Sequence, residues 1–89
     1  GRVIITAFGI NKPGIVAKIT GSLAEMEIDL QDISQKIMQN FFTLIMIVDI
    51  TSSPRNLKEV QEELARVGKE LTIKIYAQHE DIFQYMFRI

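Results

Sequence analysis

The segment Asn11-Lys12-Pro13-Gly14-Ile15-Val16 carries residue types suited to holding an anion with backbone atoms. Pro13 fixes its own φ and disfavours a helical conformation at Lys12, while Gly14 allows unusual dihedrals and close approach of a ligand. The periodicity predicts a helix beginning at Gly14, whose first N–H groups lack partners at the positive end of the helix dipole. An amino-acid carboxylate can bind there without side-chain charge. The alternative is that Pro-Gly only connects a strand to a helix.

Other constellations in the chain do not support catalysis. Gly9 and Gly14 have the G-x-x-x-x-G spacing, but Ile15 and Val16 stand where a phosphate-binding loop has Lys and Ser or Thr. The single histidine, His79, has no obvious second ligand and is interpreted as a helix cap or surface residue. Several carboxylates are spaced as on solvated turns and helix faces, without a nucleophile or base: Asp29, Asp32, Glu59, Glu62 and Glu63. We therefore predict a non-enzyme with no catalytic residue, no metal site and no cofactor.

Composition limits the class of protein. Eighty-nine residues predict one domain, residues 1–89, and a hydrophobic content of 47% is high for so small a chain, so another subunit is expected to bury apolar surface. The chain has no Cys, which excludes disulfides and thiolate sites and favours a reducing, cytoplasmic compartment. A net charge of −1 with intermixed signs argues against nucleic-acid or membrane partners. We find neither an apolar run of membrane-spanning length nor a signal peptide.

The first half of the chain predicts a strand, a helix and a second strand. Val3 to Phe8 is apolar on both alternations apart from Thr6, which is typical of a central strand. The helix from Gly14 to Glu27 has one apolar stripe: Val16, Ile19, Leu23 and Met26. Ile28 to Gln39 mixes apolar and polar residues, with Ile33 and Ile37 on one alternation, and we expect an edge strand.

The second half predicts a strand, a helix, a strand and a short helix. Phe41 to Ile50 is apolar on both alternations and should be central. Ser53 is expected to be the N-cap and Pro54 the first residue of a helix that ends at Gly68. Leu71 to Gln78 alternates as a half-buried strand. The C-terminal helix, residues 79–89, follows the domain core, residues 2–78, and carries four apolar residues: Ile82, Phe83, Met86 and Phe87.

The order β-α-β-β-α-β-α predicts an α+β fold, a ferredoxin-like sandwich with an antiparallel sheet of order 4-1-3-2 and an extra C-terminal helix. The two strands that are apolar on both sides fall in the centre of that sheet, which supports the topology. Because both long helices lie on one face, the other face needs a cover. We expect the C-terminal helix, a second subunit, or both.

Two other ferredoxin-like families fit poorly. An acylphosphatase uses an Arg in its first strand-to-helix loop, and the loop from Gly9 to Val16 contains none. An RNA-recognition motif stacks bases on central-strand aromatics, for which Phe8, Phe41 and Phe42 are the candidates. Without a basic stripe or the basic-Gly-aromatic consensus, we interpret these phenylalanines as core residues.

The chain resembles the ACT-domain family over nearly its whole length. The resemblance lies in Phe8-Gly9, in the loop from Asn11 to Val16, and in Ile28-Asp29-Leu30 followed by Asp32-Ile33-Ser34-Gln35. It is similar to stand-alone prokaryotic ACT proteins, in which the domain is the entire polypeptide. The resemblance implies a regulatory, allosteric domain that binds an amino acid and acts on a metabolic enzyme or on transcription.

The resemblance also implies where the effector binds, between the first loop of one subunit and the second strand of a neighbouring subunit. Asn11 stands where the family often has Asp, and Asp29 where it often has Asn, so one carboxylate remains for a ligand ammonium. The expected ligand-binding residues are Asn11, Lys12, Pro13, Gly14, Ile15, Val16, Asp29 and Leu30. We expect a homodimer, joined by sheet edges or by sheet faces. The alternative function is an association module that has lost ligand binding.

Overall fold

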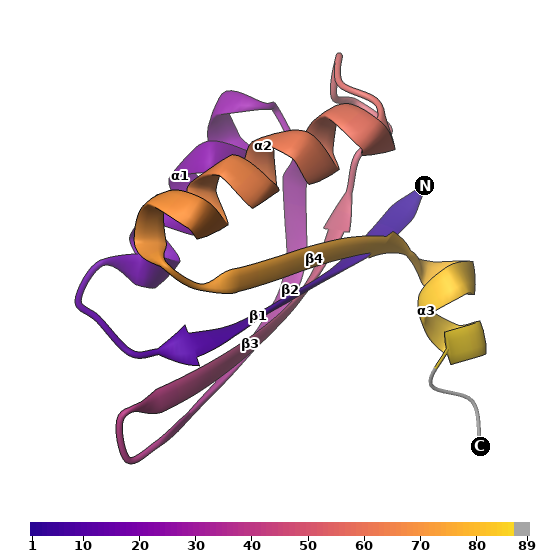
Figure 1. Cartoon of the computed structure of the whole chain (residues 1–89). Helices are drawn as coiled ribbons and strands as arrows, with labels where there is room; N and C mark the ends of the chain where they lie inside the picture. Colours follow the sequence, from indigo (N-terminus) through magenta and orange to yellow (C-terminus); the bar gives the residue numbers. More distant parts are fainter. Residues whose placement is uncertain (87–89) are drawn as a thin grey trace.

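The computed structural model describes residues 1–86, which fold as β-α-β-β-α-β-α (Figure 1). The predicted ferredoxin-like order of elements, with its extra C-terminal helix, is confirmed. The elements are β1 (Arg2–Ile10), α1 (Ile15–Glu25), β2 (Asp29–Met38), β3 (Phe41–Asp49), α2 (Leu57–Leu71), β4 (Lys74–His79) and α3 (Glu80–Met86).

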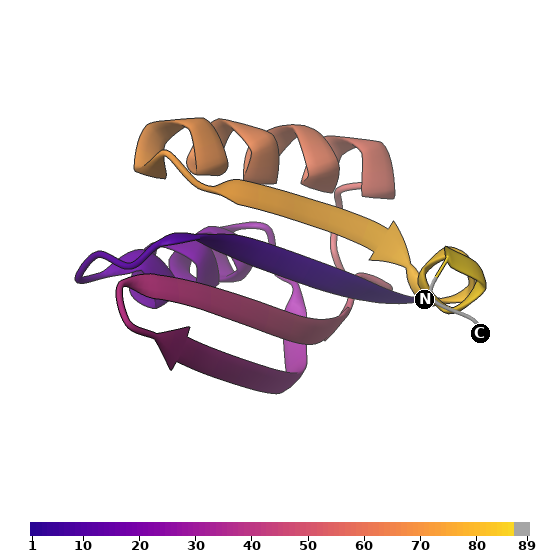
Figure 2. The ribbon, with the colours of Figure 1, turned by 60° about the horizontal axis from the view of Figure 1, so that its bottom comes forward.

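The four strands form one antiparallel sheet of order β2-β3-β1-β4, the predicted order read from the other edge. Figure 2 shows β4 (orange) and β1 (indigo) side by side, with the β2–β3 hairpin completing the sheet. Helices α1 and α2 lie together on one face (Figure 1). We call the opposite face the open face.

The core lies between the sheet and the two long helices. Alternate residues of β1 and β3 point into it, as the sequence pattern predicts for central strands. The core side chains of the sheet layer are those of Ile73, which directly precedes β4, and of the strand residues Val3, Ile5, Ala7, Phe42, Leu44, Met46, Val48 and Ala77. The interpretation of three phenylalanines as core residues is right for Phe42 alone. Phe8 and Phe41 lie on the open face with about half of each side chain exposed, because the strand pleat turns them away from the helices.

Strand β2 is an edge strand, as predicted, and all ten of its residues are exposed. Its register with β3 sets Leu30, Ile33 and Ile37 on the same side as α1 and α2. In the described part of the chain, the helices leave these apolar side chains uncovered.

The predicted start of α2 is wrong. Ser53 and Pro54 lie before the helix, where the Ser53 hydroxyl donates to the Met26 carbonyl oxygen at 2.5 Å. The N-cap is Asn56, whose Oδ1 accepts from Glu59 N at 2.9 Å, while the Glu59 carboxylate accepts from Asn56 N at 3.0 Å. This reciprocal capping box satisfies two N–H groups, more than a serine followed by proline offers.

The predicted end of α2 is also wrong, because the helix continues through Gly68 to Leu71 and ends at Thr72 in a left-handed conformation. Gly68 is required for packing instead. A Cβ on Gly68 would lie 2.9 Å from the carbonyl oxygen of Ile73, so only glycine lets the last turn approach the start of β4.

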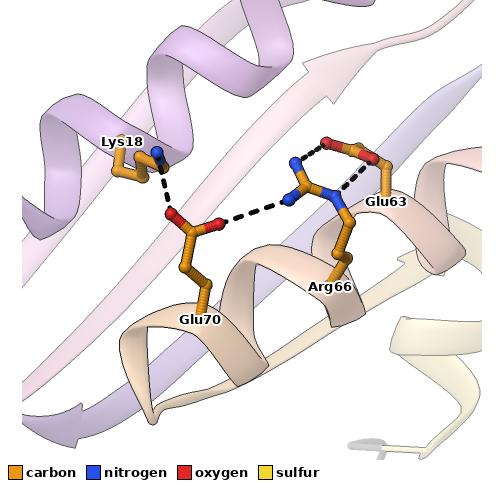
Figure 3. Close-up of polar contacts among 4 residues, drawn as sticks. All are labelled: Lys18, Glu63, Arg66 and Glu70. Atoms are coloured by element: carbon orange, nitrogen blue, oxygen red, sulfur yellow. Dashed lines mark hydrogen bonds and ion pairs between the residues drawn. The ribbon is translucent and has the colours of Figure 1, made fainter.

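Four charged residues link the exposed sides of α1 and α2 (Figure 3). Lys18 of α1 contacts Glu70 of α2 at 3.0 Å, and Arg66 bridges Glu70 and Glu63 along α2. The Arg66 hydrogen bond lowers the pKa of the Glu63 carboxyl, and the Lys18 hydrogen bond lowers the pKa of Glu70. These contacts hold the two helices in register on the surface.

Helix α3 lies at the end of the sheet, away from α1 and α2 (Figure 1). The apolar stripe of this helix also predicts that Phe83 and Phe87 are buried aromatics. For Phe83 this is wrong, because Phe83 is only half-buried and no residue within Glu80–Met86 is fully buried. Along its described length the helix lies against β1 and β4, and most of its residues are exposed. Phe87 lies outside the described residues. No helix within residues 1–86 is long and apolar enough to cross a membrane.

Candidate functional site

Gly14 is the N-cap of α1 and adopts a left-handed conformation, with φ 83° and ψ 2°. In the described part of the chain, no side chain caps the helix here, and the first turn of α1 contains no acidic residue. A Cβ built on Gly14 would meet no described atom within 4 Å. The start of α1 therefore combines N–H groups that have no helical partner with open space in front of them.

The loop before Gly14 is held by two adjacent residues at its start, Asn11 and Lys12. Asn11 N donates to the carbonyl oxygen of Asn40 at 2.7 Å, which ties the loop to the turn between β2 and β3. Lys12 Nζ donates to the carbonyl oxygen of Leu71 at 3.2 Å, at the end of α2. This lysine therefore neutralises the negative end of α2 instead of facing the start of α1.

The two residues after Gly14 belong mainly to the core. Ile15 is 2% exposed and packs in the core, and Val16 is half-buried against it. Their side chains are therefore turned away from solvent, and the backbone N–H groups are what the start of the helix offers to a ligand. Pro13 and Gly14 are exposed and border this position.

Asp29 and Leu30 lie at the other end of the sheet within one chain. Asp29 pairs with Asp49, which pairs with Arg2, whereas the loop follows Ile10. The eight residue steps between Arg2 and Ile10 correspond to about 27 Å along the strand. The structure therefore groups the loop residues, but does not bring Asp29 and Leu30 to them within a single copy.

The surroundings of Asp29 are polar and exposed. Asp49, its cross-strand neighbour, accepts a hydrogen bond from Thr51 N at 2.8 Å. Hydrogen bonds from Thr51 lower the pKa of the Asp49 carboxyl, which also lies 3.7 Å from the N-terminal ammonium group of Gly1. Leu30 follows on the side of the sheet that carries α1.

Sequence reasoning missed Asn40, whose backbone carbonyl holds the loop beside the β2–β3 turn. A backbone contact between Asn11 and Asn40, 29 residues apart, leaves no signal in residue types. Of the two interpretations left open for His79, a helix cap or a surface residue, its Nδ1 makes a contact typical of the first, since it accepts from Asp81 N at 3.2 Å at the start of α3. Across residues 1–86, no group of three His, Cys, Asp or Glu is arranged to hold a metal ion. The geometry suits backbone recognition of an anion.

A family model described as ACT domain matches residues 1–78. The chain belongs to the ACT-domain family. A UPF0237 protein of Methanococcus maripaludis is 46% identical over 88 residues, covering 99% of this chain and 98% of that protein. ACT domains are regulatory, non-catalytic domains that bind small-molecule effectors and often dimerise.

Solved ACT structures share the fold. An ACT domain protein from Streptococcus pneumoniae superposes with a TM-score of 0.81 at 32% identity, covering 93% of each chain. The ligand-free regulatory subunit of aspartate kinase from Thermus thermophilus superposes with a TM-score of 0.69 at 25% identity, covering 86% of this chain and 50% of that subunit. The second of these is described as the regulatory subunit of an enzyme.

Proposed function

We propose that this ACT domain is a non-catalytic regulatory module that binds an amino acid. The single observation that carries the proposal is Gly14, a left-handed, exposed glycine at the start of a helix that the described side chains leave uncapped. A carboxylate accepts hydrogen bonds from such N–H groups, and the helix dipole favours its charge. The absence of cysteine favours the cytoplasm as its compartment.

The proposed site requires two copies of the chain. The β2 edge is unpaired in the single chain and runs antiparallel to a copy of itself when two copies meet about a two-fold axis. Such pairing sets the start of one β2 beside the end of the other. The end of β2 pairs with Phe41, next to the Asn40 carbonyl that holds the loop. Asp29 of a second copy thus comes to the loop end of the sheet.

Each end of an amino acid then has a partner. The carboxylate takes the N–H groups that follow Gly14, and Asp29 of the second copy pairs with the ammonium group. Leu30 of the second copy, on the α1 side of the sheet, contacts the ligand side chain. Asn11 and Pro13 border the ligand, while Lys12, Ile15 and Val16 hold the loop and the helix in position.

A second candidate function is an association module that binds no effector. The exposed apolar side chains of β2 favour it, since Leu30, Ile33 and Ile37 are sufficient for a contact between copies. In that case the left-handed glycine has only a structural role. The two functions differ in one observable, the binding of a small molecule to the isolated protein.

A calorimetric screen of the twenty amino acids tests the proposal. We expect one or a few to bind, and Gly14→Val to lose that binding. Asp29→Asn should weaken binding by about 1.5–3 kcal/mol, the range for a hydrogen bond to a charged group, or roughly 10- to 150-fold. Asp81→Asn, an exposed carboxylate on α3, is the matched control and should bind as the parent does. Unchanged affinity in Gly14→Val and in Asp29→Asn would rule out this site.

A further inference from the structure

The open face of the sheet has an ordered pattern of side chains. Cross-strand pairing arranges them in rows that run across the four strands. The central row is Ser34, Ile45, Thr6 and Tyr76. One row lies on each side of it. Towards α3 lies the row Asp32, Ile47, Ile4 and Gln78, and towards the loop the row Lys36, Thr43, Phe8 and Lys74.

This face carries exposed apolar side chains in the single chain, flanked by polar and charged ones. Phe8, Ile45 and Tyr76 are each about half exposed, and the Phe8 and Tyr76 rings lie in contact with centroids 6.1 Å apart. Four strands of up to ten residues give a flat projection of roughly 500 Å². The side chains of the open face stand above that flat projection, so their accessible area is larger. This area comes close to the roughly 800 Å² that each partner contributes to a stable interface.

A second copy fits this face only in one of two simple orientations. With a two-fold axis parallel to the strands, β2 of one copy crosses β4 of the other, and Lys36 faces Lys74. With the axis across the strands along the central row, β2 faces β2, and Asp32 faces Lys36 of the other copy. The first orientation opposes like charges, whereas the second forms two symmetric opposite-charge pairs.

The axis along the central row also matches apolar groups. It sets Ile4 opposite Phe8 of the other copy. It brings Met38 and Phe41, among the most exposed apolar residues of the strands, towards α3 of the other copy. There, Phe83 and Met86 form one wall of an apolar groove of about 730 Å³ over the sheet. The β2–β3 turn and α3 lie at opposite ends of the sheet (Figure 1). The contact between Met38 and Phe41 of one copy and α3 of the other therefore forms twice, once at each end of the paired sheets.

We propose that the open face is covered by the open face of a second copy of this chain, related by a two-fold axis along the row Ser34, Ile45, Thr6 and Tyr76. The contact is independent of effector binding and of the pairing of β2 edges, because it uses the broad face of the sheet and not its edge.

The oligomeric mass gives the first test. Multi-angle light scattering of the parent should report an oligomer, and Ile45→Glu, at the centre of the face, should halve its mass. Ala65→Glu is the control, since Ala65 is an exposed apolar residue on α2 and belongs neither to the open face nor to the β2 edge. A monomeric parent, or an unchanged mass in Ile45→Glu, would overturn the proposal.

Cross-linking gives a geometric test, because the sequence contains no cysteine. On the axis, each Thr6 faces Thr6 of the other copy across about 10 Å, the distance between packed sheets. Two copies joined only by β2 edges keep these residues about 24 Å apart, since five strand spacings separate them. A short bismaleimide should therefore link Thr6→Cys into dimers in high yield. It should link Ala65→Cys, on the exposed side of α2, only at the collisional level.

Ile45→Cys lies on the same axis and repeats the test if Thr6→Cys folds poorly. Absence of linked dimer from both variants, or equal yields from Thr6→Cys and Ala65→Cys, would contradict the proposal. Protection of either cysteine by a single-stranded oligonucleotide would also contradict it, because the exposed aromatics would then serve as a base-stacking surface.

Discussion

Replacement of Gly14 by alanine isolates the left-handed backbone on which the proposed site depends. A Cβ at this position meets no described atom within 4 Å, so the change introduces no steric clash with the rest of the chain. What remains is the backbone strain of a left-handed residue with a side chain, about 1–2 kcal/mol. The reduced entropy of the unfolded chain offsets about 0.4–1 kcal/mol of it. We expect a net destabilisation of about 1 kcal/mol.

Gly21→Ala is the matched control, because Gly21 also has open space around its Cβ position but lies in the interior of α1. Alanine there should stabilise by about 0.5–1 kcal/mol, the helix-propensity difference. In a domain of this size, 1 kcal/mol corresponds to about 4–8 °C in Tm. Calorimetric unfolding should therefore move the two variants in opposite directions. A Gly14→Ala variant as stable as the parent would refute the left-handed geometry.

Three further predictions concern stability, measured by thermal or chemical unfolding. Asn56→Ala removes the capping box of α2 and should cost about 1 kcal/mol, whereas Ser53→Ala should cost less if Asn56 is the cap. Phe83→Ala should cost about 1–2 kcal/mol, below the 3–5 kcal/mol of a fully buried aromatic, and an unchanged Tm would mean that α3 is peripheral. The folded-state pKa values of Glu63 and Glu70 lie below 4.5, so their stabilising contribution is present above that pH and is lost as pH falls through the folded values. Arg66→Gln should reduce this acid sensitivity, and an identical pH profile would count against the contact.

The fold was predictable because its pattern is local and redundant. The runs from Val3 to Phe8, apart from Thr6, and from Phe41 to Ile50 are apolar on both alternations, and such strands belong in the centre of a sheet. The same pattern does not indicate which of the two apolar sides of such a strand faces α1 and α2. Phe41 and Phe42 are adjacent and identical, yet the pleat exposes one and buries the other.

Helix ends were less predictable because several residues compete for one role. Ser53-Pro54 and Asn56-x-x-Glu59 are both N-terminal signals three residues apart, and the reciprocal hydrogen bonds favour the second. Gly68 resembles a helix end, but it lies where α2 approaches Ile73. That approach is a tertiary contact, which no local pattern specifies.

Only the loop of the candidate site was predictable from the sequence, and its distance from Asp29 was not. Pro13-Gly14 before an apolar stripe indicates a loop at the start of a helix, and the structure has that loop. The distance between the loop and Asp29 follows from strand register, so the need for a second copy emerges only from the sheet. Lys12, a candidate for ligand contact by residue type, is instead held by the end of α2.

A subunit-mixing experiment tests most directly the claim that two copies build one effector site. Gly14→Val and Asp29→Asn are each expected to leave both sites of a dimer impaired. In a mixed dimer, one site combines both substitutions and the other combines two unaltered segments. At an amino-acid concentration that leaves either variant alone empty, an equal mixture after subunit exchange should recover about a quarter of the parent's binding capacity. A mixture that binds no more than its two components would contradict a site shared between copies.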